Sequence, residues 1–77
     1  MTPEQLLGRY LRELRLSRGW TLVELADKTG MANGSLSRIE RGQCGTSIKV
    51  ICKLARSFNI SPCEILMKSG YLDEFKY

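Results

Sequence analysis

Apolar residues recur at three- and four-residue spacings along most of the chain, and short polar segments separate these stretches. The segments 22–29 and 31–41 each carry one apolar face of this kind, and Gly30 lies between them. The two faces consist of Leu22, Leu25 and Ala26, and of Met31, Leu36 and Ile39. The small Ala26 lets two backbones approach, and Gly30 permits a left-handed turn after the first helix. The pattern therefore predicts two closely crossed helices, with the polar side of the second left outside.

Three hydroxyl residues mark helix starts, because each is followed three positions later by glutamate or glutamine, the pattern of a capping box. The pairs are Thr2 with Gln5, Thr21 with Glu24, and Ser61 with Glu64. They predict helices that begin near residues 3, 22 and 62, and the first is expected to run to about Arg18. Another helix is predicted to begin after Thr46 or Ser47. Its expected apolar face consists of Ile48, Ile51, Cys52, Ala55 and Phe58.

No segment alternates as a strand would, and the chain has no repeat or low-complexity segment. We therefore predict an all-α, compact five-helix domain over residues 1–70, followed by a C-terminal tail over residues 71–77. A chain of this length buries only about 60–65% of its unfolded surface, so we expect a single thin core and no second domain.

The helix predicted after Met31 has a polar side opposite its buried leucine and isoleucine. At 100° per residue, this side carries Gly34, Ser37, Arg38 and Arg41, with Asn33 beside them. Asparagine and arginine make paired hydrogen bonds to purine edges, serine bonds to bases, and glycine allows a backbone to come close. An ordinary solvated helix face with two arginines fits this helix alone equally well. The surrounding sequence favours the DNA-reading interpretation.

The segments Leu25–Gly30 and Leu36–Gly42 resemble the helix-turn-helix of the Cro and lambda-repressor family, also called Xre-type. The resemblance covers roughly residues 6–67. It implies a lambda-repressor-like domain that binds double-stranded DNA through a helix-turn-helix at its second and third helices. The expected base-contacting residues are Asn33, Gly34, Ser37 and Arg38. The expected phosphate-contacting residues are Thr21, Lys28, Arg41, Gln43 and Lys49.

Two positions depart from the family's pattern. Ala32 stands where the family usually has a capping serine or threonine, so Asn33 either caps the helix itself or reaches a base. We favour a DNA-facing Asn33. Leu22 stands where many relatives have a phosphate-contacting glutamine, although its backbone N–H remains a donor at a helix start.

A carboxylate on the DNA-facing helix would repel phosphates unless a cation neutralised it. The family resemblance implies an inward ion pair between Arg15 of the first helix and Glu40, which would fix the recognition helix to the rest of the domain. The alternative is two independent surface charges.

The net charge of +4 is divided unevenly along the chain. Residues 1–60 have ten lysines or arginines against five acidic residues, whereas residues 61–77 have two against three. The basic excess of the helical part favours a phosphate-bearing partner, and the basic residues do not form the dense run expected at a membrane surface. We expect four arginines to face solvent, namely Arg9, Arg12, Arg18 and Arg56.

The chain has few of the residues that catalysis or metal binding requires. The chain has no histidine, no clustered carboxylates and no nucleophile beside an evident base, so we expect neither an enzyme nor a metal site nor a cofactor. We interpret Cys52 as a core residue, and Cys44 as an exposed loop thiol for which redox sensing is a minor alternative. Cys63 completes an odd set of three cysteines without a CxxC pair.

No apolar run reaches membrane-spanning length and no signal-peptide pattern is present, so we expect a cytoplasmic protein, associated with the nucleoid when bound to DNA.

The C-terminal third has more apolar residues than one short helix hides readily. They are Ile60, Ile65, Leu66, Tyr71, Leu72 and Phe75. We expect some of them to form a homodimer interface, because one recognition helix reads few base pairs and a dimer reads an inverted repeat. The tail folding back over its own core is the alternative.

The expected function is a sequence-specific transcription regulator that resembles phage repressors and restriction-modification controllers, with polymerase as a further partner. The alternative function is an antitoxin or interaction module acting through the apolar C-terminal region.

Overall fold

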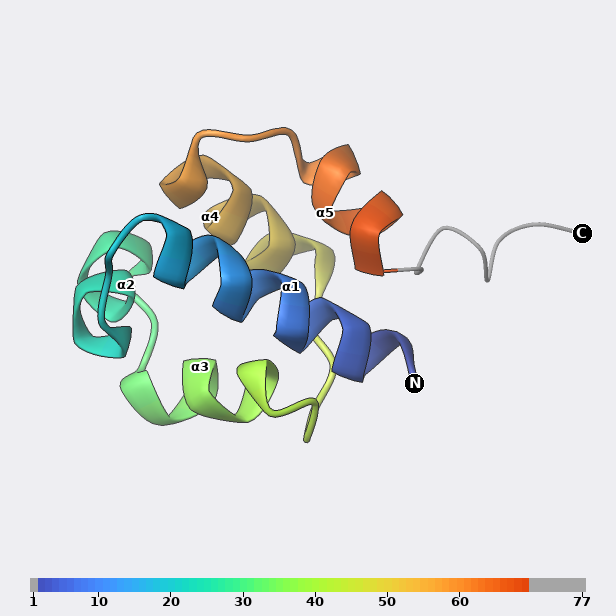
Figure 1. The fold of residues 1–77 in the computed structure, drawn as a ribbon, viewed down its shortest axis with the longest axis horizontal. Helices are drawn as coiled ribbons and strands as arrows, with labels where there is room; N and C mark the ends of the chain where they lie inside the picture. Colours follow the sequence, from blue (N-terminus) through green and yellow to red (C-terminus); the bar gives the residue numbers. More distant parts are fainter. Residues whose placement is uncertain (1, 70–77) are drawn as a thin grey trace, which may run out of the picture.

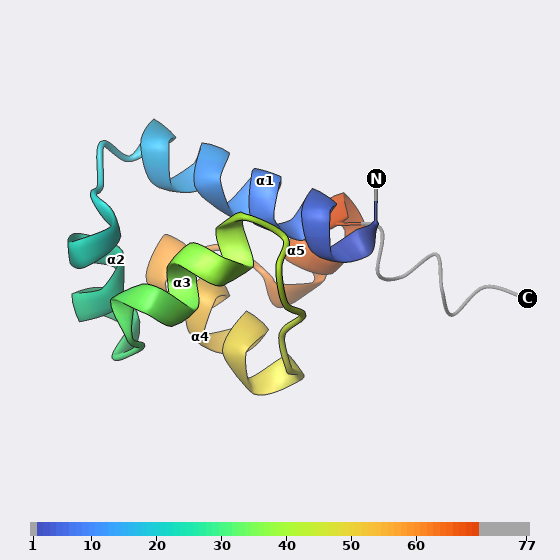
Figure 2. The same ribbon diagram turned by 90° about the horizontal axis from the view of Figure 1, so that it is seen from below.

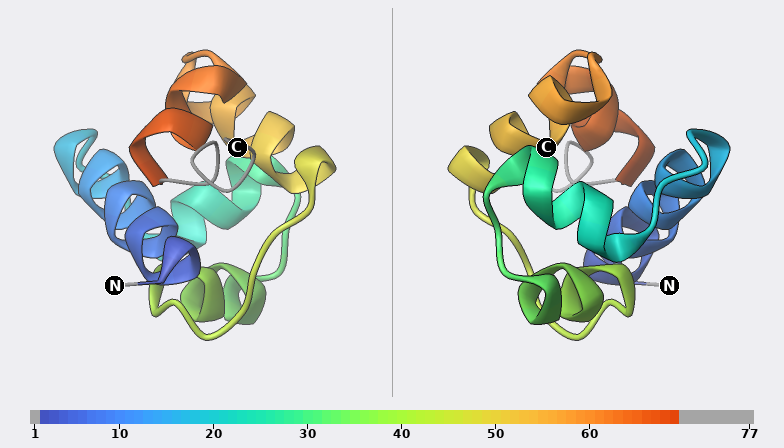
Figure 3. Two further views of the ribbon diagram at one scale, coloured as in Figure 1. Left: turned by 90° about the vertical axis from the view of Figure 1, so that its right-hand side faces the viewer. Right: turned by 90° about the vertical axis from the view of Figure 1, so that its left-hand side faces the viewer.

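The computed structural model describes residues 2–69, which form five α-helices and contain no strand (Figure 1). The helices are α1 (Pro3–Ser17), α2 (Leu22–Thr29), α3 (Asn33–Glu40), α4 (Ile48–Phe58) and α5 (Pro62–Ser69). The longest helix, α1, packs against both α3 and α5, while α4 packs against α2 and α5. Seen end-on, α3 lies beneath the core with α4 and α5 above it (Figure 3). The predicted all-α, five-helix fold is confirmed.

Most helix starts follow the predicted capping chemistry. Thr2 and Thr21 each form both hydrogen bonds of a capping box, and the Ser47 hydroxyl accepts from the N–H of Val50 at the start of α4. The partner predicted for the Ser61 hydroxyl is wrong, because this hydroxyl accepts from the N–H of Cys63, two residues further along the chain. The N–H of Glu64 instead donates to the Ser61 carbonyl, so the helix begins where expected through a different local turn.

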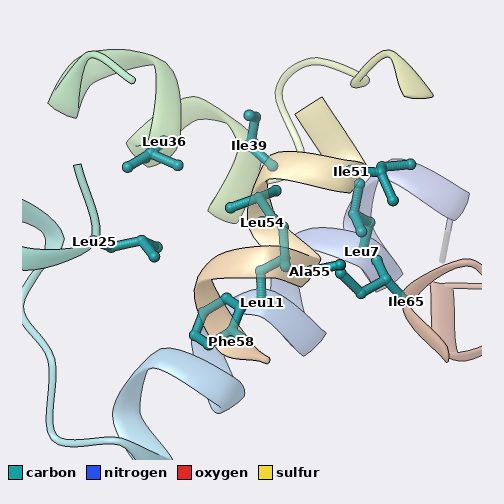
Figure 4. Packing of buried hydrophobic residues seen from close by; sticks show 10 residues of the cluster. All are labelled: Leu7, Leu11, Leu25, Leu36, Ile39, Ile51, Leu54, Ala55, Phe58 and Ile65. Carbon is teal, nitrogen blue, oxygen red and sulfur yellow. The ribbon is translucent and has the colours of Figure 1, made fainter. Parts of the chain in front are cut away.

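The core draws on all five helices, and its side chains converge between them (Figure 4). Its buried members are Leu7, Leu11, Leu25, Leu36, Ile39, Ile51, Leu54, Ala55, Phe58 and Ile65. Two predictions for α4 need correction. Ile48, expected inside, is 64% exposed, because it lies in the first turn, beyond the helices that cover the rest of α4. Cys52 is only half-buried and does not belong to the buried core.

Two backbone features set the position of α3. Gly30 ends α2 with a left-handed conformation, φ 70°, and its N–H donates to the carbonyl of Ala26. Gly8 of α1 lies directly against the end of α3, where a Cβ atom on residue 8 would come within 2.6 Å of the Glu40 carbonyl oxygen. The absence of a side chain at Gly8 therefore lets α1 and α3 pack backbone to backbone. No helix among residues 2–69 has both the length and the apolar character needed to cross a membrane.

Candidate nucleic-acid interface

The α3 helix presents a polar face on the outside of the molecule, and Figure 2 views the protein from that side. Leu36 and Ile39 are buried and anchor the helix to the core. Opposite them lies the polar set predicted from the sequence. Asn33, Gly34, Arg38 and Arg41 are exposed, and Ser37 is half-buried. Among residues 2–69, the side chains of Asn33, Arg38 and Arg41 have no hydrogen-bond or ion-pair partner, and they supply donors and acceptors suited to base edges.

Asn33 does not cap α3. The N-cap position belongs to Ala32, which makes no side-chain hydrogen bond, and Asn33 is the first residue of the helix. Within residues 2–69 the Asn33 amide has no hydrogen-bond partner. The absence of a capping side chain leaves backbone donors at the helix start unsatisfied, and it leaves the Asn33 amide available to a ligand outside the chain.

Arg15 and Glu40 form a two-point ion pair between α1 and the end of α3. Arg15 Nε donates to Glu40 Oε2 at 2.8 Å, and Nη2 donates to Oε1 at 3.0 Å. The third nitrogen, Nη1, donates to the Trp20 carbonyl at 2.9 Å, in the turn that precedes α2. The side chains are only 12% and 7% exposed. The hydrogen bond to Glu40 raises the pKa of Arg15 above its ordinary value, so the guanidinium stays charged. One side chain thus ties the positions of α2 and α3 together and neutralises Glu40.

A shallow hollow opens beside this ion pair, where α1, the start of α2 and the polar side of α3 meet. Its volume is about 250 Å³, and it is lined by Arg12, Arg15, Leu22, Ser37, Glu40 and Arg41. We refer to it as the α1–α3 hollow. Ser37 and Arg41 were expected at the DNA-facing surface, whereas Arg12 was expected to face solvent. Arg12 is exposed, as expected, but the sequence pattern does not predict that it lies beside α3, because nothing in the pattern gives the rotation of α1 relative to α3.

The residues predicted to contact phosphate do not all come together. Arg41 lies at the end of α3, and Gln43 follows it closely, with its backbone N–H bonded to the Arg38 carbonyl. Lys49 is exposed in the first turn of α4. The Thr21 hydroxyl is already engaged, since it accepts from the Glu24 N–H and bonds to the Glu24 carboxylate. Capping therefore occupies the side chain of Thr21 in this structure.

Lys28 lies apart from the polar face of α3. Its ammonium is 4.6 Å from the ring centroid of Trp20, and that ring stacks on Phe58 with a centroid separation of 5.3 Å. Lys28 lines a second hollow with residues of α4, among them Lys53 and Arg56. Lys28 and Arg56 belong to the last turns of α2 and α4, where the helix dipole itself favours a positive charge. Their placement needs no nucleic-acid partner.

The four arginines expected to face solvent are all exposed, but their surroundings differ. Arg9 pairs with Glu13 on the outer face of α1 at 3.4 Å, and both side chains are about two-thirds exposed. Arg18 donates to the carbonyl of the last residue of α4 at 2.8 Å. Arg56 lines the second hollow, and Arg12 lines the α1–α3 hollow. Arg12 is thus the only one of the four beside α3.

The residues predicted for the dimer interface divide into three groups. Ile65 is fully buried within the protomer's own core, so it is unavailable to a partner and its assignment is wrong. Ile60 and Leu66 are half-buried and pack against that core. Tyr71, Leu72 and Phe75 lie outside the described residues. Met67 of α5, which the sequence pattern did not single out, is 65% exposed. The described residues include no group of acidic residues or cysteines able to hold a metal ion.

Comparison with known proteins matches residues 11–65 to the helix-turn-helix (HTH_3) family model. The chain is 34% identical over 67 residues to the competence pilus inhibition repressor of Acinetobacter baylyi, a match that covers 87% of this chain and 61% of that protein. It is 37% identical over 68 residues to the transcriptional repressor RghR of Bacillus subtilis, covering 87% of this chain and 50% of that one. The chain thus spans about half to three-fifths of these relatives' lengths.

Among solved structures, the restriction-modification controller protein C.AhdI of Aeromonas hydrophila superposes with a TM-score of 0.77 at 35% identity, covering 80% of this chain and 94% of that one. The likeness to a restriction-modification controller was expected from the sequence, and it is confirmed. The matched region includes all of α2, α3 and α4, together with the C-terminal part of α1 and the first half of α5. The chain belongs to the Xre-type helix-turn-helix (HTH_3) family of DNA-binding domains rather than to an enzyme family.

Proposed function

We propose that this protein is a sequence-specific transcription regulator of the repressor type, which binds double-stranded DNA through α3. The observation that carries the proposal is the division of α3 into two faces. Leu36 and Ile39 are buried, while Asn33, Gly34 and Arg38 project outward without a partner among residues 2–69. The names of the relatives, which include repressors, support a regulatory role.

In this proposal α3 lies in the major groove, with Asn33 and Arg38 at base edges. An arginine makes bidentate hydrogen bonds to guanine, and an asparagine makes them to adenine. In the same proposal the phosphate backbone is contacted by Arg41 and Gln43, at the C-terminal end of α3, and by Lys49, in the first turn of α4. These contacts fix the register of α3 on the duplex. Because Arg15 holds both oxygens of Glu40, the carboxylate at the end of α3 does not repel the phosphates.

Two-fold pairing is the second part of the proposal. A dimer would place two α3 helices about 34 Å apart, one helical turn of DNA, and would read an inverted repeat. Exposed Met67, half-buried Leu66 and the apolar residues beyond residue 69 are the surface proposed for the dimer. Binding at a promoter would then block polymerase or, through direct contact, recruit it.

Replacing Arg38 with alanine tests the reading of bases. If the guanidinium bonds to a guanine, Arg38→Ala costs about 1–3 kcal/mol of binding free energy and relaxes the preference at one position of each half-site. The affinities of matched and singly substituted duplexes, measured by fluorescence anisotropy at one salt concentration, report both effects. Arg9→Ala, which removes an equal charge from an exposed ion pair of α1, is the control. An equal loss of affinity on every duplex would show a phosphate role for Arg38 instead.

Gly34→Ala separates stability from binding. A Cβ atom at Gly34 meets no atom within 4 Å, so the protomer accommodates it, and the change stabilises α3 by up to about 1 kcal/mol. DNA affinity is nevertheless expected to fall, because the backbone at Gly34 lies against the duplex in this proposal. Urea unfolding and DNA titration of the same sample check the two parts. A variant that binds DNA as tightly as the wild type would contradict close approach of the backbone at Gly34.

A further inference from the structure

Arg12 and Arg41 come from different helices and line the same cavity, the α1–α3 hollow. Both residues are exposed, and neither forms an ion pair with any residue between 2 and 69. Ser37, on the outward side of α3, lines the hollow with them. The cavity is therefore continuous with the face of α3 that is proposed to read DNA.

The charge inside the hollow is strongly unbalanced. Its lining has three arginines and a single carboxylate, that of Glu40. Both oxygens of Glu40 are bonded to Arg15, so that pair is already neutral. The guanidinium groups of Arg12 and Arg41 then remain without a counter-charge from the lining. Two such groups around one hollow suit an anion with several acceptor oxygens, and a phosphate diester has that chemistry.

Among residues 2–69, the Arg12 side chain forms no hydrogen bond or ion pair that would account for its position. Arg41 follows the last residue of α3, where a positive charge complements the helix dipole, and the same holds for Lys28 and Arg56 in the second hollow. Arg12 lies in the interior of α1, away from both helix ends, and has no acidic partner at the next turn. Among these cations, Arg12 is the one whose placement is best explained by a ligand.

We propose that Arg12 is a further DNA-contacting residue, and that a backbone phosphate of the bound duplex occupies the α1–α3 hollow between Arg12 and Arg41. This inference rests on the proposed function and extends its binding surface from α3 to α1. The contact carries no base information, since it reaches only the sugar-phosphate backbone. Its effect is to raise affinity and to fix the rotation of the domain on the duplex.

The test is the salt dependence of DNA binding by Arg12→Gln. The plot of log affinity against log salt has a negative slope, and a variant that neutralises one phosphate fewer has a slope that is less steep by about 0.9. Between 50 and 200 mM salt, the affinity ratio of wild type to variant should therefore shrink about 3.5-fold. The probe is the duplex most enriched by the wild-type protein from a random pool. Base preferences are expected to be unchanged.

Arg56→Gln is the matched control, because it removes the same charge from an exposed arginine of the second hollow. If net charge alone mattered, the two variants would behave alike. Arg12→Lys is expected to retain the wild-type slope, since an ammonium also neutralises a phosphate. Thermal melting of each variant verifies that the fold is kept.

An Arg12→Gln slope equal to that of the wild type, or equal to that of Arg56→Gln, would overturn the inference while leaving the proposed function intact. A changed preference at one base pair would also overturn it, because Arg12 would then read a base. A wild-type protein without preference among duplexes would overturn the proposed function itself, and the inference with it.

Discussion

Replacing Glu40 with alanine is expected to lower the free energy of unfolding by about 3–5 kcal/mol, because the guanidinium of Arg15 would stay buried without its carboxylate partner. The two hydrogen bonds of 2.8 and 3.0 Å would be lost, and only the bond from Arg15 Nη1 to the Trp20 carbonyl would remain. A domain of this size has a total stability near the lower end of about 5–15 kcal/mol. The change therefore removes a large share of it.

Urea denaturation followed by circular dichroism measures this loss. The matched control is Glu13→Ala, which breaks the exposed pair with Arg9 on the same helix and is expected to cost about 0.3–0.5 kcal/mol. A double variant, Arg15→Met with Glu40→Leu, removes both charges and should recover most of the stability, since apolar replacements of a buried pair are often neutral. Equal effects of Glu40→Ala and Glu13→Ala would show that the Arg15–Glu40 pair does not fix α3.

Gly8→Ala is the second substitution with a large expected effect. Its new methyl group would lie within 2.6 Å of the Glu40 carbonyl oxygen and would also contact the backbone of Ile39. Backbone atoms cannot rotate away as a side chain does, so α1 and α3 must separate. Overpacking of this kind costs about 1–3 kcal/mol, and the backbone contact places Gly8→Ala at the upper end. We expect a melting temperature about 12–24 °C lower for a loss of about 3 kcal/mol.

Differential scanning calorimetry of Gly8→Ala beside Gly34→Ala isolates the steric cause. Both variants exchange glycine for alanine in a helix, but a Cβ atom at Gly34 meets open space. Gly34→Ala is expected to melt at or slightly above the wild-type temperature. If Gly8→Ala melted at the same temperature as Gly34→Ala, the close packing of α1 on α3 would be contradicted. DNA binding by folded Gly8→Ala should also weaken, because α3 is displaced.

The sequence predicts the helices well because their start signals are local. A capping box needs only Thr2 with Gln5, or Thr21 with Glu24, and both form as expected. The two faces of α3 are equally local, since they follow from helical periodicity within eight residues. These features require no knowledge of which helix packs on which.

Each feature that the sequence does not reveal depends on how the helices are placed relative to one another. Ile48 and Ile65 are both apolar residues on amphipathic helices, yet one is 64% exposed and the other fully buried. The difference arises from which neighbours cover each residue. Arg12 is exposed as expected, but its place beside α3 was not predicted, because the rotation of α1 against α3 is a tertiary property. The backbone contact at Gly8 marks the point where these two helices cross, which periodicity does not predict.

Selection of bound duplexes from a random pool tests most directly whether α3 reads DNA through its outward face. The wild-type protein, at moderate ionic strength, is expected to enrich an inverted repeat with half-site centres about 10 base pairs apart. Arg38→Ala, selected in parallel, is expected to lose the preference at one position of each half-site while keeping the spacing. No enrichment by the folded wild-type protein, or the same enriched sequence from both proteins, would contradict the central claim.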